Sequence, residues 1–227
     1  MTQGLYRLGQ MTTIPPARRA PLTGVVAVLL LVGSLIVEGQ PPDADAATED
    51  VVRFYSENDA RLLAATLIGG LAAAFLIWFG GSVFALRSAE GEPGRVSAIA
   101  FGGFLLAAAG LTMSFGFVFA AAQTVGEVPA EVTQTLAVLG ALFFAPFAVG
   151  VLVALLASAV AILRHGARPR WLGHVTILIA VACVMSAGFG AAIAIAAWIL
   201  ATAVWVLIVS VVVFLRQTPT ERASSPR

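Results

Sequence analysis

The chain has 227 residues, of which 59% are hydrophobic and only 11% are charged, and its mean hydropathy is +0.96. Soluble domains contain roughly 25% charged and 45–50% apolar residues, so this composition excludes an ordinary soluble fold, disorder, collagen-like repeats and disulfide scaffolds. The net charge of +1 also argues against nucleic acid as a partner, because phosphate binding needs a concentrated basic face. An all-α integral membrane protein is the class that remains.

Six apolar runs without Asp, Glu, Lys or Arg predict six transmembrane helices, since about 20 apolar residues are needed to cross the hydrocarbon core. The fifth and sixth runs are continuous in composition, and we divide them at Gly188-Phe189-Gly190, where glycine tolerates a tight turn. The predicted transmembrane domain, 22–216, follows a short N-terminal segment, 1–21, and precedes a tail, 217–227. Its predicted spans are 22–37, 62–86, 96–122, 133–163, 171–187 and 191–215, with an outer loop over 38–61.

The distribution of charge predicts the orientation. Eleven of the 13 arginines fall in the N-terminal segment, the second and fourth connections and the tail, whereas nine of the 12 acids fall in the other connections. Under the positive-inside rule both termini are then cytoplasmic. The residues predicted to anchor the helices at the membrane interface are Arg87, Arg95, Arg164, Arg168, Arg170 and Trp171.

Two alternatives for the N-terminus stay open. Arg18 and Arg19 followed by the first apolar run also fit the start of a signal peptide, with Ala44-Asp45-Ala46 as a distant cleavage triplet. The start could also be Met11, which leaves the topology unchanged.

The outer connections contain helix signals of their own. Thr48–Tyr55 alternates apolar and charged residues in the pattern of a short amphipathic helix, either an interfacial linker or a lid over an outward cavity. Ser56 with Asp59 fits a capping box ahead of the second span. Pro129 with Glu131 predicts the first turn of the fourth span.

No recognised catalytic or metal-binding motif is present. The acids Asp43, Asp45, Glu49 and Asp50 lack the spacing and glycine of a calcium loop, which favours a solvated acidic loop. The two histidines, His165 and His174, have no Cys or acid at ligand spacing. We therefore expect no enzymatic activity, no metal and no cofactor.

Small residues recur on one face of the third and fourth spans. Without a hydrophobic drive between helices in lipid, such stripes permit the close backbone approach that holds a bundle together. They indicate packing within the chain, or, as the alternative, a homo-oligomer or contact with another membrane protein. The stripe residues are Gly103, Ala107, Gly110, Ser114, Gly150 and Ala154.

Pro146 should bend the fourth span, because it removes a backbone hydrogen bond. Phe143, Phe144 and Phe147 surround it, and Phe115 is available on the third span. These aromatic residues predict either a pocket for an apolar ligand, facing outward between the second, third and fourth spans, or lipid-facing side chains.

Three short motifs carry a resemblance: Phe54-Tyr55 with Asn58, Leu86-Arg87 with Glu90-Gly91 and Gly94-Arg95, and Pro169-Arg170-Trp171-Leu172-Gly173. Through them the chain resembles a group of six-span actinobacterial membrane proteins related to domain-of-unknown-function families. The resemblance covers most of residues 22–216 and implies the six-span architecture in a bacterial cytoplasmic membrane, but no activity.

The sequence therefore predicts a non-enzymatic structural or accessory membrane protein that contacts lipids. The alternative is a binder or carrier of an apolar or lipid-like small molecule, held in an outward-facing cavity near the bend of the fourth span.

Overall fold

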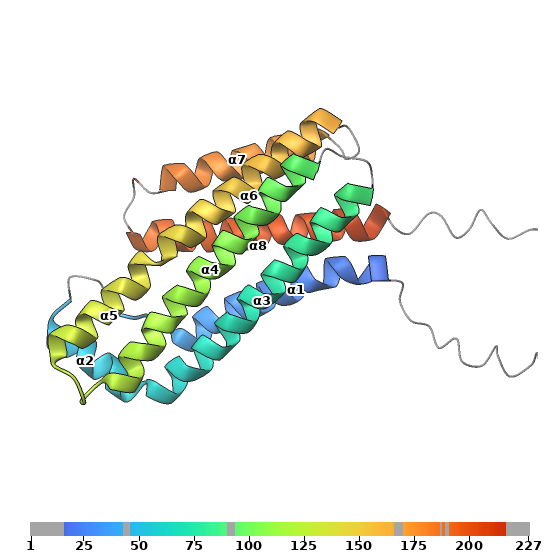
Figure 1. Cartoon of the computed structure of the whole chain (residues 1–227). Coiled ribbons are helices and arrows are strands. Elements are labelled where there is room, and N and C mark those ends of the chain that lie inside the picture. The colour runs from blue at the N-terminus through green and yellow to red at the C-terminus, as the bar shows by residue number, and fades with distance from the viewer. Residues whose placement is uncertain are drawn as a thin grey trace, which may run out of the picture.

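A computed structural model describes residues 16–42, 46–89, 94–165, 170–186, 188 and 191–216 (Figure 1). Within these residues the regular structure is entirely helical, which confirms the predicted all-α class. The helices are α1 (Pro16–Glu38), α2 (Thr48–Glu57), α3 (Asp59–Ala89), α4 (Gly94–Thr124), α5 (Ala130–Leu142), α6 (Phe144–His165), α7 (Arg170–Ser186) and α8 (Ala191–Arg216).

Four helical stretches are long and apolar enough to cross a membrane. They are Asp59–Ala85, Gly94–Thr124, Ala130–Arg164 and Ala194–Phe214. Two more apolar helices, Leu22–Glu38 and Arg170–Ser186, are shorter. The apolar runs predicted from the sequence therefore all form helices.

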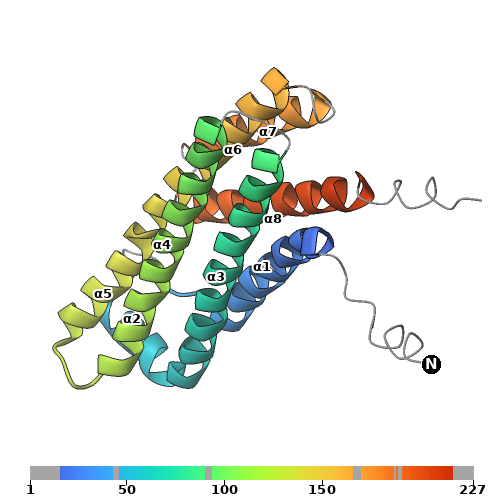
Figure 2. The same ribbon diagram turned by 45° about the vertical axis from the view of Figure 1, so that its right-hand side comes forward.

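Six of the helices form a closed ring in which each packs against the next, in the order α1, α3, α4, α6, α7, α8 and back to α1. Figures 1 and 2 both show α3, α4 and α6 running side by side. Both views also show α2 and α5 at one end of the bundle, beside the start of α3 and the end of α4. The short helices thus cover one end of the ring.

The closest helix contact joins α4 to α6. A Cβ atom added at Gly103 would lie 2.6 Å from the main-chain nitrogen of Ala154 and 2.7 Å from the carbonyl oxygen of Gly150. A Cβ at Gly150 would likewise meet the main chain at Ala107. Any residue larger than glycine would push the two backbones apart, so the small-residue stripe is used for packing within the chain.

Trp205 fills the centre of the ring. Its indole ring, 2% exposed, lies 6.4 Å from the ring of Phe79 and 6.0 Å from that of Phe104, measured between centroids. Its Nε1 donates a hydrogen bond to the Thr176 hydroxyl at 2.9 Å, and that hydroxyl donates to the carbonyl of Leu172. A buried indole N–H needs such a partner, and here it ties α8 to α7 across the core.

The predicted fourth span is interrupted. Residue Phe143 separates α5 from α6, three positions before Pro146. Proline has no N–H to offer the carbonyl of Leu142 and its ring crowds that carbonyl, so the break falls one turn before it. The separation of the last two spans at the glycine pair is also confirmed, since α7 ends at Ser186 and α8 begins at Ala191.

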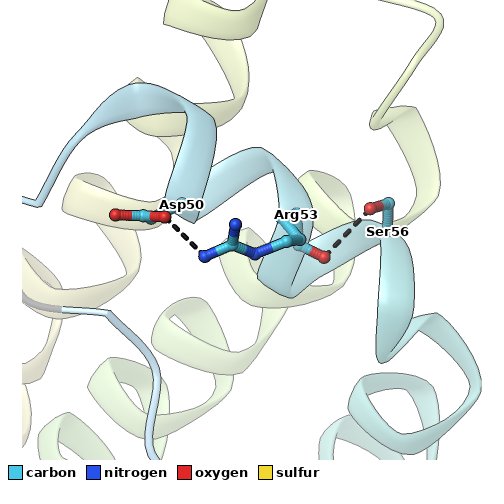
Figure 3. Close-up of polar contacts among 3 residues, drawn as sticks. All are labelled: Asp50, Arg53 and Ser56. Carbon is cyan, nitrogen blue, oxygen red and sulfur yellow. Dashed lines mark hydrogen bonds and ion pairs between the residues drawn. The ribbon is translucent and has the colours of Figure 1, made fainter.

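The capping box predicted at Ser56 is wrong. Helix α2 continues through Glu57, so Ser56 has a helical backbone, and its hydroxyl donates to the carbonyl of Arg53 at 2.9 Å (Figure 3). The carboxylate of Asp59 instead accepts a hydrogen bond from the next main-chain N–H, that of Ala60, at 2.6 Å.

Replacing Gly103 by alanine should destabilise the protein by about 1–3 kcal/mol, because the added methyl group overpacks the contact between α4 and α6. The matched control is Gly102→Ala on the same helix, where a Cβ atom meets nothing within 4 Å. The control should leave stability unchanged or slightly raised, since alanine is the better helix former. Thermal unfolding in a mild detergent measures both, and equal melting temperatures would contradict the importance of this contact.

Candidate ligand-binding cavity

Helix α2 closes one end of the bundle. Its apolar face, with Val51 and Tyr55 each 3% exposed, packs in a small core with Leu62 of α3 and Val118 of α4. The opposite face exposes Arg53, whose guanidinium pairs with Asp50 at 2.5 Å (Figure 3). The predicted amphipathic helix is thereby confirmed, and it lies folded over the end of the bundle.

One side chain fastens the start of α2 to α5. The hydroxyl of Thr48 donates to Oε1 of Gln134 at 2.7 Å, and Nε2 of Gln134 donates to the carbonyl of Ala46 at 3.3 Å. Gln134 is half-buried. Both polar atoms of its side-chain amide form hydrogen bonds with residues 46–48, at the start of α2.

A cavity of about 700 Å³ lies beneath α2. Its walls come from the end of α1 and residues 39–42, from α2, α4 and α5, from the first residue of α6 and from the first turns of α8. Most of the lining is apolar, with Leu111, Phe115 and Phe144 furthest from α2 along their helices. Ligand sites commonly have volumes of about 300–1,000 Å³ and an apolar lining with a few polar groups, so both properties suit a small molecule.

Among the lining residues that the structure describes, Glu38 is the only acidic one, and it lies at the last position of α1, just beyond the predicted first span. Burial raises the pKa of its carboxyl from 4.5 to about 7, although the positive charge of Arg61 acts in the opposite direction. A carboxyl with this pKa changes its charge near neutral pH.

Arg61 lies beside this carboxyl but donates its hydrogen bond elsewhere, to the main-chain carbonyl of Glu38, at 2.7 Å. Its guanidinium also lies 6.0 Å from the centroid of the Phe54 ring, within the range of a cation–π contact. The position requires Gly39, whose φ of +78° ends α1 and whose missing side chain leaves room for the guanidinium.

Tyr55 adds a hydroxyl to the polar end of the cavity. Burial, and secondarily the charge of Glu38, raises its pKa to about 12, so the phenol stays protonated. On the wall formed by α4 and α5, the hydroxyl of Ser114 donates to the carbonyl of Gly140 at 2.7 Å. Hydrogen-bonding groups are therefore few, and they come from four different helices.

The aromatic residues predicted to form a pocket divide into two groups. Phe115 and Phe144 line the cavity. Phe147 is fully buried against Gly110 of α4, and Phe143 stacks on Phe117 at 4.9 Å between ring centroids. Neither these two nor Pro146 lines the cavity, because α6 turns this part of its surface toward α4.

The location of the cavity also differs from the prediction. It opens between α1, α2, α4, α5 and α8, and no residue of α3 lines it. The sequence does not predict Glu38, Tyr55 or Gln134 as pocket residues, although it places Tyr55 in the amphipathic segment. A signal was present, since Glu38 is the first charge after an apolar run and lies on the face of the membrane where the amphipathic helix was expected.

The predicted interface anchors that the structure describes are exposed. They are Arg95, Arg164, Arg170 and Trp171. Arg168 lies outside the described residues, as do Asp43, Asp45 and the side chain of Arg87. Within the described part of the chain, no three His, Cys, Asp or Glu side chains gather closely enough to hold a metal ion.

Replacing Glu38 by glutamine should make stability less dependent on pH. Between pH 4.5 and about 7 the folded protein keeps a proton that the unfolded chain has lost, so wild-type stability falls as the pH rises through this window. The variant should match wild type near pH 4.5 and melt at a higher temperature at pH 8.

Thermal unfolding in one detergent at several pH values measures this effect. Glu57→Gln makes the same chemical change on the exposed face of α2, outside the cavity, and should follow the wild-type profile. A constant difference between Glu38→Gln and wild type at every pH would contradict the burial of this carboxyl.

No protein-family model matches the chain, and comparisons with curated proteins and with solved structures return no similar protein. The resemblance to six-span actinobacterial proteins stays a prediction, since none of these comparisons tests it. What the protein does must therefore be inferred from its own side chains and their arrangement.

Proposed function

We propose that the protein is a six-span protein of a bacterial cytoplasmic membrane, with both termini in the cytoplasm. We further propose that it binds an amphiphilic, lipid-like small molecule in the cavity beneath α2. It does so without catalysis, and membrane lipids surround it. The cavity is the observation that supports the binding function. The apolar surface exposed on the helices supports the location in a membrane.

The outer surface of the helices is strongly apolar. Large hydrophobic side chains are exposed on most of the ring, among them Ile36, Trp78, Leu178 and Leu200, each at least 65% exposed. Contiguous apolar surface of this extent is unfavourable in water and is typical of a face covered by lipid. Arg95, Arg164 and Arg170 are exposed at helix ends, where guanidinium groups reach lipid headgroups.

The six-span topology has two short apolar stretches, Leu22–Glu38 of α1 and the whole of α7, and α7 is the one with no further helical residues to extend it. Its 17 residues correspond to about 26 Å at 1.5 Å per residue, close to the lower limit for a span. Local thinning of the bilayer accommodates such a mismatch at a modest cost. Trp171, which is 53% exposed, suits an interface position at the start of this helix.

Alkaline phosphatase fusions test this topology, because the enzyme needs an oxidising compartment to form its disulfides. A fusion after Val128 should be active and a fusion after His165 inactive. Fusions to a fluorescent protein that matures only in the cytoplasm should give the reverse pattern. Activity of the phosphatase after His165 would overturn the orientation.

The cavity lies at the end of the bundle that this topology places outside. It is reached beneath α2, which is tied to α5 by the two hydrogen bonds of Gln134 and otherwise by apolar contacts. Apolar side chains on α4, α6 and α8 suit a hydrocarbon chain, and the few polar groups near α2 suit a headgroup. The arrangement thus favours an amphiphile over a wholly polar solute.

Native mass spectrometry of gently extracted protein tests this function. Wild type should retain one small molecule or lipid species at fixed stoichiometry. Ala141→Phe and Ala196→Phe, which fill the cavity from α5 and α8, should each reduce its occupancy at least tenfold. Ala98→Phe, at an exposed position of α4 outside the cavity, should retain it. Heterogeneous lipid on all four proteins would contradict a specific site.

A structural or accessory role is the second candidate, and one observation favours it. Helix α4 exposes Gly102, Ala109 and Gly116 at intervals of two turns, and a Cβ atom at either glycine would meet nothing within 4 Å. Such a stripe permits close packing of another transmembrane helix, from a second copy or from another protein. In the same mass spectra, a second polypeptide instead of a small molecule would support this role.

A further inference from the structure

The polar groups of the cavity gather at its outer end. Glu38 ends α1, Tyr55 lies on the buried face of α2, and Gln134 lies in the second turn of α5. Along α4 the lining runs from Val118 near α2 to Leu111 two turns deeper and contributes only one hydroxyl on the way. The cavity is therefore a polar mouth joined to an apolar channel.

The Glu38 carboxyl is the one acidic group at this mouth among the described residues, and no donor within them forms a hydrogen bond with it. The amide of Gln134 is satisfied on both sides by the start of α2. Arg61, the nearest cation, donates to the main-chain carbonyl of Glu38 and lies over Phe54. Arg61 is also exposed and does not line the cavity, so Glu38 lines the cavity with a cation nearby but without an ion pair among the described residues.

A positively charged donor is the partner that best stabilises the ionised form of this carboxyl, because charge-assisted hydrogen bonds are stronger than neutral ones. A divalent metal needs several oxygen ligands, and one carboxylate in an apolar lining does not supply them. A protonated amine needs only one charged acceptor and a few neutral ones, and the rest of the lining suits a hydrocarbon chain. An anionic headgroup would meet like charge.

We infer that the ligand is an amphiphile with a protonated amine, whose ammonium group pairs with Glu38 and whose apolar chain extends along Leu111, Phe115 and Phe144. This inference rests on the proposed function and names its ligand class. The amine could belong to a free long-chain amine or to the headgroup of an aminophospholipid, and the chemistry at Glu38 is shared by both.

Binding should release a proton. Because burial raises the pKa of Glu38 to about 7, a large fraction of the carboxyls in the empty site are neutral at neutral pH, whereas an ammonium group favours the ionised form. Among the described residues, the charge that acts on this carboxyl is that of Arg61 on α3, and the neighbouring phenol of Tyr55 on α2, whose pKa is raised to about 12, stays protonated. The cavity residues of α4, α5, α6 and α8 carry no ionisable side chain. Affinity for the amine should therefore rise about tenfold from pH 6 to pH 8.

The test uses full-length protein in phosphatidylcholine nanodiscs and tritiated dodecylamine in a scintillation proximity assay, with empty nanodiscs as the background. On wild type, unlabelled dodecylamine should compete at a concentration at least tenfold lower than dodecanol does. Glu38→Gln should lose this preference and the pH dependence. Glu57→Gln, an exposed acid on α2 outside the cavity, should retain both.

Equal competition by dodecanol, with binding unaffected by Glu38→Gln, would overturn the amine inference and leave the proposed cavity function standing. Absence of saturable binding by either compound would overturn both. If Glu38→Gln does not fold, the affinity of wild type for dodecylamine, measured from pH 6 to pH 8, tests the inference instead. An affinity that does not change with pH overturns it. Competition by phosphatidylethanolamine in the nanodisc supports a lipid as the source of the amine, and its failure to compete supports a free amine.

Discussion

The backbone contact between α4 and α6 is the constraint on which the rest of the bundle depends. Lipid offers no hydrophobic drive for helices to associate, so dispersion at very short range must hold them, and only glycine allows it. Gly103 and Gly150 each face the main chain of the other helix, and Gly110 does the same toward Phe147. Because these contacts leave no room for adjustment, α6 has one position against α4, and Phe147 is buried there instead of reaching the cavity.

The cavity follows from the division of the buried apolar residues into two separate cores. A large core around Trp205 joins the six helices of the ring, and a small core joins α2 to the start of α3 and the end of α4. Residues of both cores line the cavity, which therefore separates them. Helix α5 lines the cavity beyond the break at Phe143, and Ser114 keeps it hydrogen-bonded to α4.

At the boundary between the two cores a single carboxyl decides the chemistry. Glu38 is half-buried at the end of an apolar helix, and the nearby Arg61 donates to its main-chain carbonyl in the space that Gly39 leaves open. An ion pair would have neutralised the group internally, whereas the observed geometry leaves it available to a ligand. Helix α2 over the cavity, the apolar channel and one carboxyl without an ion pair make a more specific site than the cavity volume alone would indicate.

The sequence by itself determined the helical class, the helices' places along the chain, the amphipathic α2 and the glycine stripe, because each depends on local composition and spacing. It also placed Phe115 and Phe144 near a pocket. It did not determine which face of α6 meets α4, and so could not separate Phe144 from Phe147. Nor did it bring Glu38, Tyr55 and Gln134 together, since they come from segments far apart in the chain. Only tertiary packing brings these three residues together. Backbone contacts at glycine set the positions of the helices, and the resulting burial raises the pKa of the Glu38 carboxyl.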